Sequence, residues 1–298
     1  MFSAVLNASG RSARIAVTLG AGVWGLYWIP LRALDAAGIT GAWAVVVFYL
    51  LPVVIWAPVA VVRRRELAAG GWGVWLSGGL VALSFVFYAG SLIFTEVVRA
   101  LLLFYLTPVW STILARIMLG EPFTRQRLAA FGLGFAGLIV ILGVDQGPPI
   151  PINTGDWFAL LSGLLWAFAA VRLRSDTVNH AEEMVFPYFV LGTAIALLAC
   201  AIPDGRTGPV PELDAVIGVL PWLLPVMLVM VVPAAFFVIW GTRQIDAGLV
   251  GLLFMAEISV GTISAALFAG EPFGWREIIG VLLISSAGLL EAVWPKRR

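Results

Sequence analysis

The side chain best placed to do chemistry is Glu257, a carboxylate about ten residues into a long apolar stretch. A charge at the centre of a bilayer costs at least about 2.5 to 3.5 kcal/mol, so its presence there needs a reason. In apolar surroundings a carboxylate holds a proton more readily and attracts cations. Glu257 is therefore a candidate for proton coupling or for pairing with the ammonium group of a ligand. The alternative is a structural hydrogen bond between helices.

Aromatic and hydroxyl side chains form a second set of candidates. Trp24 and Trp28 share one helical face, and Ser84 and Tyr88 belong to a stripe of hydroxyl residues at helical spacing. Aromatic rings can stack on a ligand, and hydroxyl groups can hydrogen-bond to it. The predicted ligand-binding residues are Trp24, Trp28, Ser84, Tyr88, Tyr105, Trp166 and Glu257. A packing seam between helices for the hydroxyl stripe, and interfacial belts for the tryptophans, remain the alternatives.

Prolines interrupt several of the apolar stretches. A proline removes a backbone donor and leaves a carbonyl group that must find another partner, so it bends or breaks a helix. Pro30, Pro108, Pro225 and Pro233 are the predicted kinks. They could help gates to move, or they could simply bend the helices.

Catalytic residues are not evident. The one histidine, His180, stands beside acidic residues in a polar segment, and no His/Cys cluster has metal-ligand spacing. No glycine-rich motif ending in Gly-Lys-Ser/Thr is present to hold a nucleotide phosphate. We therefore expect no enzyme activity, cofactor or metal, and the net charge of +1 does not indicate nucleic-acid binding.

The composition indicates which elements carry these residues. Hydrophobic residues make up 61% and charged residues 12%, whereas soluble domains have about 25% charged residues. Each helix that crosses a bilayer needs about 20 apolar residues. Hydropathy predicts ten such helices, near residues 14–34, 39–62, 72–94, 98–118, 126–144, 155–173, 184–203, 214–240, 247–269 and 275–294. The predicted fold class is an all-α membrane protein.

An internal repeat divides this set of helices into two halves. Gly120-Glu121-Pro122-Phe123 recurs 150 residues later as Gly270-Glu271-Pro272-Phe273. The halves are 1–146 and 147–298, and an odd number of spans in each forces them into opposite orientations. Two inverted five-helix repeats around a central cavity are typical of transporters, because the halves can exchange conformations and open the cavity to alternate sides.

The basic residues predict the orientation. With the N-terminus inside, only Arg32, Arg99, Arg206 and Arg276 of the 18 Lys and Arg residues fall outside. Basic residues concentrate on the cytoplasmic side of membrane proteins. We therefore expect a multi-pass protein of the cytoplasmic (inner) membrane with both termini in the cytoplasm.

The chain resembles the EamA-type members of the drug/metabolite transporter superfamily. The resemblance is carried by the segment from Ala100 to Val109, followed by Leu119-Gly120-Glu121, and in the second half by Ala256-Glu257 followed by Gly270-Glu271. Within the superfamily the chain is most similar to YddG-type exporters of aromatic and other neutral amino acids. The second half shows Ala256-Glu257-Ile258 where the usual pattern is Leu-Glu-Pro, and Thr107 stands where the second repeat has Glu257, so the site should be asymmetric.

This resemblance implies export of small amphipathic metabolites, most of all neutral amino acids, by alternating access. An exporter of multiple drugs, lipophilic cations or other metabolites is the alternative within the superfamily, and a channel or membrane scaffold is the alternative outside it. The expected partners are a small-molecule substrate and the lipid bilayer, with a monomer as the working unit.

Overall fold

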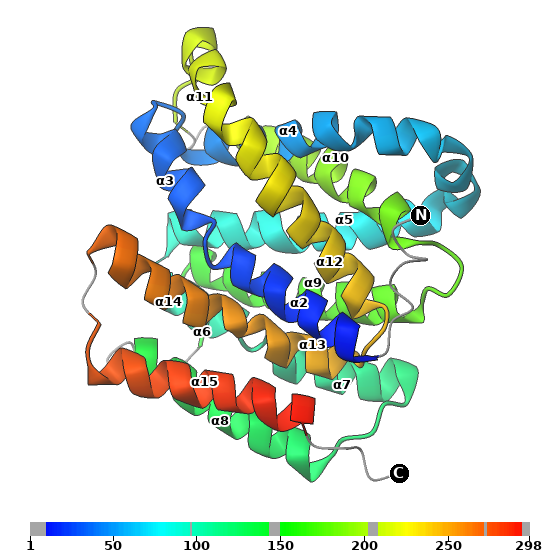
Figure 1. Cartoon of the computed structure of the whole chain (residues 1–298), viewed down its shortest axis with the longest axis vertical. Coiled ribbons are helices and arrows are strands. Elements are labelled where there is room, and N and C mark those ends of the chain that lie inside the picture. Colours follow the sequence, from blue (N-terminus) through cyan, green and yellow to red (C-terminus); the bar gives the residue numbers. More distant parts are fainter. Residues whose placement is uncertain (1–9, 96, 143–149, 202–207, 271–272, 294–298) are drawn as a thin grey trace.

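The computed structural model describes residues 10–95, 97–142, 150–201, 208–270 and 273–293, and these ranges are helical apart from short turns and connections. Figure 1 shows the helices running in broadly the same direction across the molecule, with both termini at one end, which we call the terminal end. The helices are α2 Gly10–Trp24, α3 Trp28–Ala36, α4 Gly41–Val62, α5 Arg64–Phe94, α6 Val97–Phe104, α7 Thr107–Leu119, α8 Arg125–Leu142, α9 Thr154–Ser175, α10 Ala181–Cys200, α11 Leu213–Val226, the π-helix η1 Met227–Val231, α12 Val232–Thr242, α13 Ala247–Phe254, α14 Ala256–Ala269 and α15 Trp275–Val293.

The ten predicted apolar segments each coincide with one helical stretch. Eight stretches of the described chain are long and apolar enough to cross a membrane, with mean hydropathy from 1.4 to 2.6. The other two segments are α2 with α3, which a turn separates, and α15. The all-helical fold with ten spans is confirmed.

The internal repeat is visible in the backbone of its turns. α7 and α14 both end on a glycine in the left-handed conformation, Gly120 with φ 69° and Gly270 with φ 70°. Each glycine donates its N–H to the carbonyl of an alanine five residues earlier, Ala115 or Ala265. Only glycine adopts this conformation at little cost, which explains why both copies have it. Glu271 and Pro272 of the second copy lie outside the described residues.

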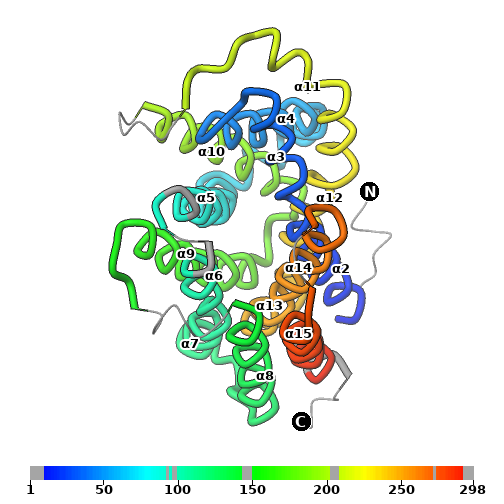
Figure 2. The backbone as a smooth tube through the Cα atoms, turned by 90° about the vertical axis from the view of Figure 1, so that its left-hand side faces the viewer, coloured from blue at the N-terminus to red at the C-terminus, as the bar shows by residue number. Residues whose placement is uncertain are grey.

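The spans of one half pack against spans of the other half. α2 packs on α12 as α5 packs on α9, and α4 pairs with α10 as α8 pairs with α15. Figure 2, which views many of the helices nearly end-on, shows this interleaving. The α8–α15 pair approaches closely at Gly137 and Gly280, where a Cβ on either would lie 2.7 or 2.9 Å from the carbonyl oxygen of the other. The described helices of the two halves thus share a single bundle and a common set of interfaces.

Four spans are interrupted near the middle of the bundle. The first is broken between α2 and α3, the fourth between α6 and α7, the ninth between α13 and α14, and the eighth widens into η1. Pro30, Pro108 and Pro233 each lie in the first turn of the helix that follows the interruption, and Pro225 lies in the turn before η1. The four prolines predicted to mark kinks therefore stand at or next to irregular backbone, since each lacks the donor that a continuous helix would need.

Buried ion pairs cross between the halves at the terminal end. Arg127 of α8, with only 2% of its side chain exposed, bonds to Asp246 before α13 at 3.0 Å and lies 3.9 Å from Glu121. Arg63, between α4 and α5, pairs with Glu183 of α10. Paired charges of this kind tie the two halves together at the terminal end, because separating a largely buried pair costs free energy.

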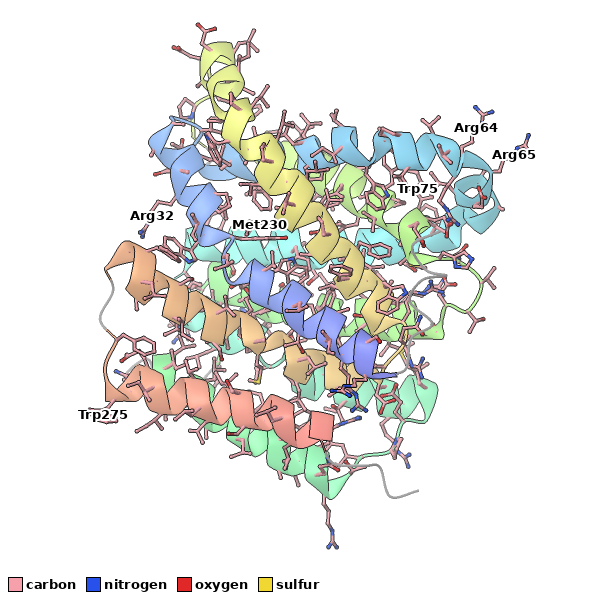
Figure 3. The ribbon with its side chains drawn as sticks, in the orientation of Figure 1. Arg32, Arg64, Arg65, Trp75, Met230 and Trp275 are labelled. Atoms are coloured by element: carbon pink, nitrogen blue, oxygen red, sulfur yellow. The ribbon has the colours of Figure 1, made fainter. Side chains whose placement is uncertain are left out.

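Exposed side chains differ between the two ends. Figure 3 shows Arg64 and Arg65 projecting from the terminal end, and Arg32 and Trp275 at the opposite end. Trp72 and Trp275 are 77% and 80% exposed. Exposed tryptophans near span ends suit the interfacial belts of membrane proteins.

Candidate substrate-binding site

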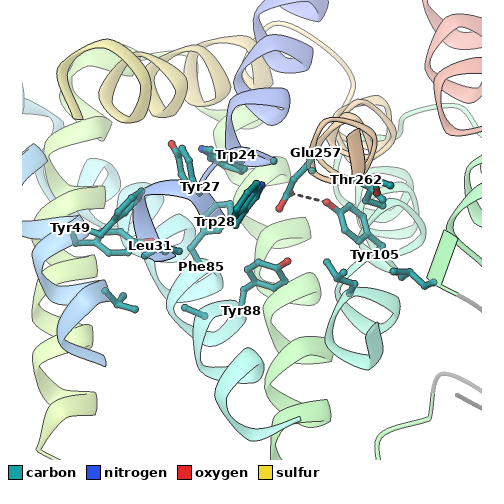
Figure 4. A pocket seen from close by; sticks show the side chains of 18 of the residues that line it. Trp24, Tyr27, Trp28, Leu31, Tyr49, Phe85, Tyr88, Tyr105, Glu257 and Thr262 are labelled. Carbon is teal, nitrogen blue, oxygen red and sulfur yellow. Dashed lines mark hydrogen bonds between the residues drawn. The ribbon is translucent and has the colours of Figure 1, made fainter. Parts of the chain in front are cut away.

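A cavity of about 380 Å³ lies among the interrupted helices. Its walls come from the α2–α3 turn, the first half of α4, the last half of α5, the α6–α7 break, α10 and the start of α14. These parts of the helices lie toward the end opposite the termini, so the cavity is offset from the closed terminal end. Figure 4 shows the aromatic rings that surround it.

Five of the seven predicted ligand-binding residues line this cavity: Trp24, Trp28, Tyr88, Tyr105 and Glu257. They come from four different spans, so no helix supplies the site alone. Aromatic rings with a few polar groups are the usual lining of a site for a small molecule.

Glu257 is positioned by a helix start and a hydrogen bond. It lies in the first turn of α14, directly after the break at Met255, where the partial positive charge of the helix N-terminus favours a carboxylate. The hydroxyl group of Tyr105 donates to its Oε2 at 2.8 Å, as Figure 4 shows. Among the described residues that line the cavity, Glu257 is the only charged one. The cavity thus combines one acidic group with an aromatic wall.

Backbone packing joins the two broken spans behind Glu257. The end of α2 touches α14 so closely at Gly25 that a Cβ there would clash with the carbonyl oxygen of Glu257 and lie 2.8 Å from the nitrogen of Gly261. A residue without a side chain is therefore required at this crossing. The contact fixes the position of the Glu257 backbone relative to Trp24 and Trp28.

Trp28 connects the cavity wall to neighbouring helices. Its indole N–H donates to the hydroxyl of Ser264 on α14 at 3.0 Å. The guanidinium group of Arg32 lies 5.2 Å from the centre of its ring, within cation–π distance. These contacts hold the ring at the boundary between α3 and α14.

Trp166 was predicted to line the cavity, and the structure places it elsewhere. Its side chain is fully buried, it is not part of the lining, and its ring packs 6.2 Å from that of Trp24 and 4.7 Å from that of Phe254. Trp166 therefore supports Trp24 from behind. The rings of the two tryptophans are packed edge to face.

Ser84 was also predicted to line the cavity, and its position is different. Its hydroxyl donates to the carbonyl of Ser162 on α9 at 2.9 Å, and Ser162 returns a bond to the carbonyl of Ser84 at 2.7 Å. Both serines are fully buried between α5 and α9, outside the lining. For Ser84, the packing seam is the correct interpretation of the hydroxyl stripe, whereas Tyr88 reaches the cavity.

The two repeats contribute different residues to the cavity. Thr107, at the place equivalent to Glu257, is 2% exposed, and its hydroxyl donates to the carbonyl of Phe104 in its own span at 2.5 Å. It does not line the cavity. The site is therefore asymmetric, as the sequence predicted, with its one acid in the second repeat.

Sequence reasoning missed several lining residues, above all Tyr27, Tyr49 and Tyr188. They lie on the α2–α3 turn, α4 and α10. No hydrophobic periodicity could identify them, because α4 and α10 are apolar on every face. The rarity of tyrosine, with five in the chain, was the available signal.

Comparison with known proteins agrees with this arrangement. The EamA-like transporter family matches twice, at residues 11–143 and 153–290. An uncharacterized transporter of Archaeoglobus fulgidus is 31% identical over 202 residues, covering 64% of this chain and 71% of the relative. The uncharacterized transporter YyaM of Bacillus subtilis is 22% identical over 211 residues, covering 69% and 67%. A solved crystal structure superposes with a TM-score of 0.75 at 18% identity, over 94% of this chain and 96% of the other.

The two matched regions each cover one half of the chain, as the repeated turn does, and together they span most of the bundle. Its relatives are named as transporters. The chain is a multi-pass membrane protein and a transporter, and it belongs to the EamA-like transporter family.

Proposed function

We propose that this transporter exports small amphipathic solutes that carry an ammonium group, with aromatic and other neutral amino acids as the favoured class. The observation that supports it most is Glu257, which Tyr105 holds and which is the one charged group among the described residues that line the aromatic cavity. A carboxylate in surroundings of low dielectric attracts an ammonium group strongly. The faces of Trp24, Trp28 and Tyr88 add cation–π attraction.

The size and shape of the cavity favour a small molecule. Ligand sites commonly have volumes of about 300 to 1,000 Å³, and the 380 Å³ here lies near the lower limit. The rings provide apolar surface for the side chain of an amino acid. A large substrate would require the walls to move apart.

We propose alternating access as the mechanism, with both termini in the cytoplasm. The interleaved inverted repeats support it, because the pairs of spans can exchange conformations about their shared axis. The ion pairs of Arg127 and Arg63 close the terminal end, so in this orientation the cavity lies toward the outside. The excess of basic residues at predicted inner positions supports the orientation and the cytoplasmic membrane as the location. The helices would bend during this exchange at the interruptions marked by Pro30, Pro108, Pro225 and Pro233. A single chain contains the complete cavity, which supports a monomer as the working unit.

A second candidate is export of lipophilic cations. The acidic group and the aromatic wall suit such a ligand, and no basic side chain lines the described cavity to bind an anionic group. Glu257 could also serve proton coupling in either case. An amino acid has a carboxylate and a lipophilic cation has none. Transport measured with one substrate of each kind therefore distinguishes the two functions.

The test is counterflow in liposomes that contain the purified protein. Labelled phenylalanine, leucine, threonine and lysine would be compared with tetraphenylphosphonium. We expect saturable exchange of the neutral amino acids, which a channel or scaffold would not show. Exchange of the phosphonium ion alone would replace the amino-acid proposal with cation export, and exchange of none of these solutes would contradict both.

A further inference from the structure

All five tyrosines of the chain line the one cavity described above. They are Tyr27, Tyr49, Tyr88, Tyr105 and Tyr188, and they come from five different spans. Tyrosine is commonly enriched at both interfaces of a membrane protein. Here the chain places every phenol group at the cavity instead, which points to a use for the hydroxyls there.

The hydroxyls form two groups. Tyr105 bonds to Glu257, and Figure 4 shows Tyr88 on the same side of the cavity. Away from them, the hydroxyl of Tyr188 donates to that of Tyr49 at 3.4 Å, and the ring of Tyr27 packs 5.0 Å from that of Phe48, the residue before Tyr49. Figure 4 shows Tyr49 on the side of the cavity opposite Glu257. The cavity thus has an acidic end and a second polar end made only of phenols.

The second group has hydrogen-bond donors to offer. The buried hydroxyl of Tyr27 has no acceptor for its proton among the described residues, because its polar neighbour is the indole N–H of Trp24, which can only donate. The hydroxyl of Tyr49 accepts from Tyr188, and no acceptor for its own proton is found in the described part of the chain. Buried donors are normally satisfied, so these two suit an acceptor on a bound molecule.

Tyr27 and Glu257 line the same cavity of about 380 Å³, which is small enough for one molecule to contact both ends. Hydrogen bonds from neutral hydroxyls to a carboxylate are short and strong because the acceptor is charged. A zwitterion brings its own neutralising charge and therefore needs no arginine or lysine at this end.

We propose that Tyr27, Tyr49 and Tyr188 form a carboxylate-binding subsite, which makes the cavity selective for amino acids over amines that lack a carboxylate. This rests on the proposed function, in which Glu257 binds the ammonium group. The subsite binds the carboxylate through the Tyr27 and Tyr49 hydroxyls, and Tyr188 positions Tyr49 by donating to it.

The test compares two ligands that differ only in the carboxylate, L-phenylalanine and phenethylamine. Each unlabelled ligand competes with labelled phenylalanine in the counterflow assay, and its affinity is taken from the inhibition. If the protein transports only the amine, labelled phenethylamine replaces labelled phenylalanine. The variants are Tyr27→Phe and Tyr49→Phe, with Tyr88→Phe as the matched control near Glu257. We expect Tyr27→Phe and Tyr49→Phe to lower the affinity for phenylalanine roughly ten- to a hundredfold, because each loses a hydrogen bond to a charged group. The affinity for phenethylamine should change less than about twofold. Tyr88→Phe should affect both ligands alike.

The ratio of the two affinities separates binding from folding, since partial unfolding lowers both equally. If the ratio stays at the wild-type value in Tyr27→Phe and Tyr49→Phe, the subsite is wrong and the proposed function stands. Wild-type protein that recognises phenethylamine but not phenylalanine would also overturn the subsite. If it recognises neither ligand, the proposed function fails first, and the subsite fails with it.

Discussion

Replacement of Gly25 by alanine should both destabilise the protein and displace its binding site. The added Cβ would lie 2.8 Å from the nitrogen of Gly261 and still closer to the carbonyl oxygen of Glu257. Comfortable contacts between such atoms are about 3.5 to 4.0 Å, so α2 and α14 would have to separate by about 1 Å. Both clashing atoms belong to the backbone and cannot rotate away.

The expected cost follows from this forced separation. Overpacking a close contact costs about 1 to 3 kcal/mol, which corresponds to a Tm lowered by several degrees in a chain of this size. Binding sites need their groups placed within about 0.5 Å, so a shift of the Glu257 backbone should also reduce transport strongly.

The assay measures thermal unfolding by tryptophan fluorescence and counterflow on the same preparations. Gly22→Ala, one turn earlier on α2, is the matched control, because its Cβ would meet only a side-chain methyl of Val260 at 3.3 Å. Gly132→Ala on α8 has nothing within 4 Å and should be neutral or stabilising. If Gly25→Ala is as stable and active as these controls, the close contact between α2 and α14 is not present.

Three further outcomes are expected. Arg127→Ala should lower stability by up to about 3 to 5 kcal/mol, because it removes the buried cation that bonds to Asp246 and lies near Glu121, and an unchanged Tm would contradict this. Burial, together with nearby Asp246, raises the pKa of Glu121 above its usual 4.5, so the folded state binds this proton more tightly than the unfolded state. The resulting stabilisation is complete below pH 4.5 and is lost as pH rises through the raised pKa. Glu121→Gln should remove this part of the pH dependence of Tm. Identical profiles of Tm against pH for the variant and the wild-type protein would refute this reasoning. Trp28→Phe should lose the bond to Ser264, costing about 0.5 to 1.5 kcal/mol by thermal unfolding, whereas Ser264→Ala in the Trp28→Phe background should cost little more.

The sequence was sufficient for the fold. The repeated turn and the ten apolar segments predicted the spans, and the prolines marked the interruptions, because these signals depend on local backbone chemistry. The break between α13 and α14 had no such signal, because no proline lies in that span.

The site could be predicted only in part. Glu257 was identifiable because an isolated charge in an apolar span is costly. Ser84 was assigned to the cavity from helical periodicity, which shows which residues share a face but not which helix covers that face. Trp166 was assigned there as an aromatic residue that could stack on a ligand. α9 covers Ser84, and Trp24 lies between Trp166 and the cavity. Tyr49 lies in a span that is apolar on all sides, so its direction depended on the packing of α4 against α10.

The most direct measurement for the role of Glu257 is calorimetric titration of L-phenylalanine and phenethylamine into purified wild-type protein and Glu257→Gln, with Trp72→Phe as a control remote from the cavity. We expect both ligands, which share the ammonium group, to bind Glu257→Gln roughly ten- to a hundredfold more weakly, since a charged hydrogen bond is lost. The control should bind them as the wild-type protein does. Unchanged affinity for both ligands in a folded Glu257→Gln protein would contradict the assignment of this carboxylate as the ammonium-binding group.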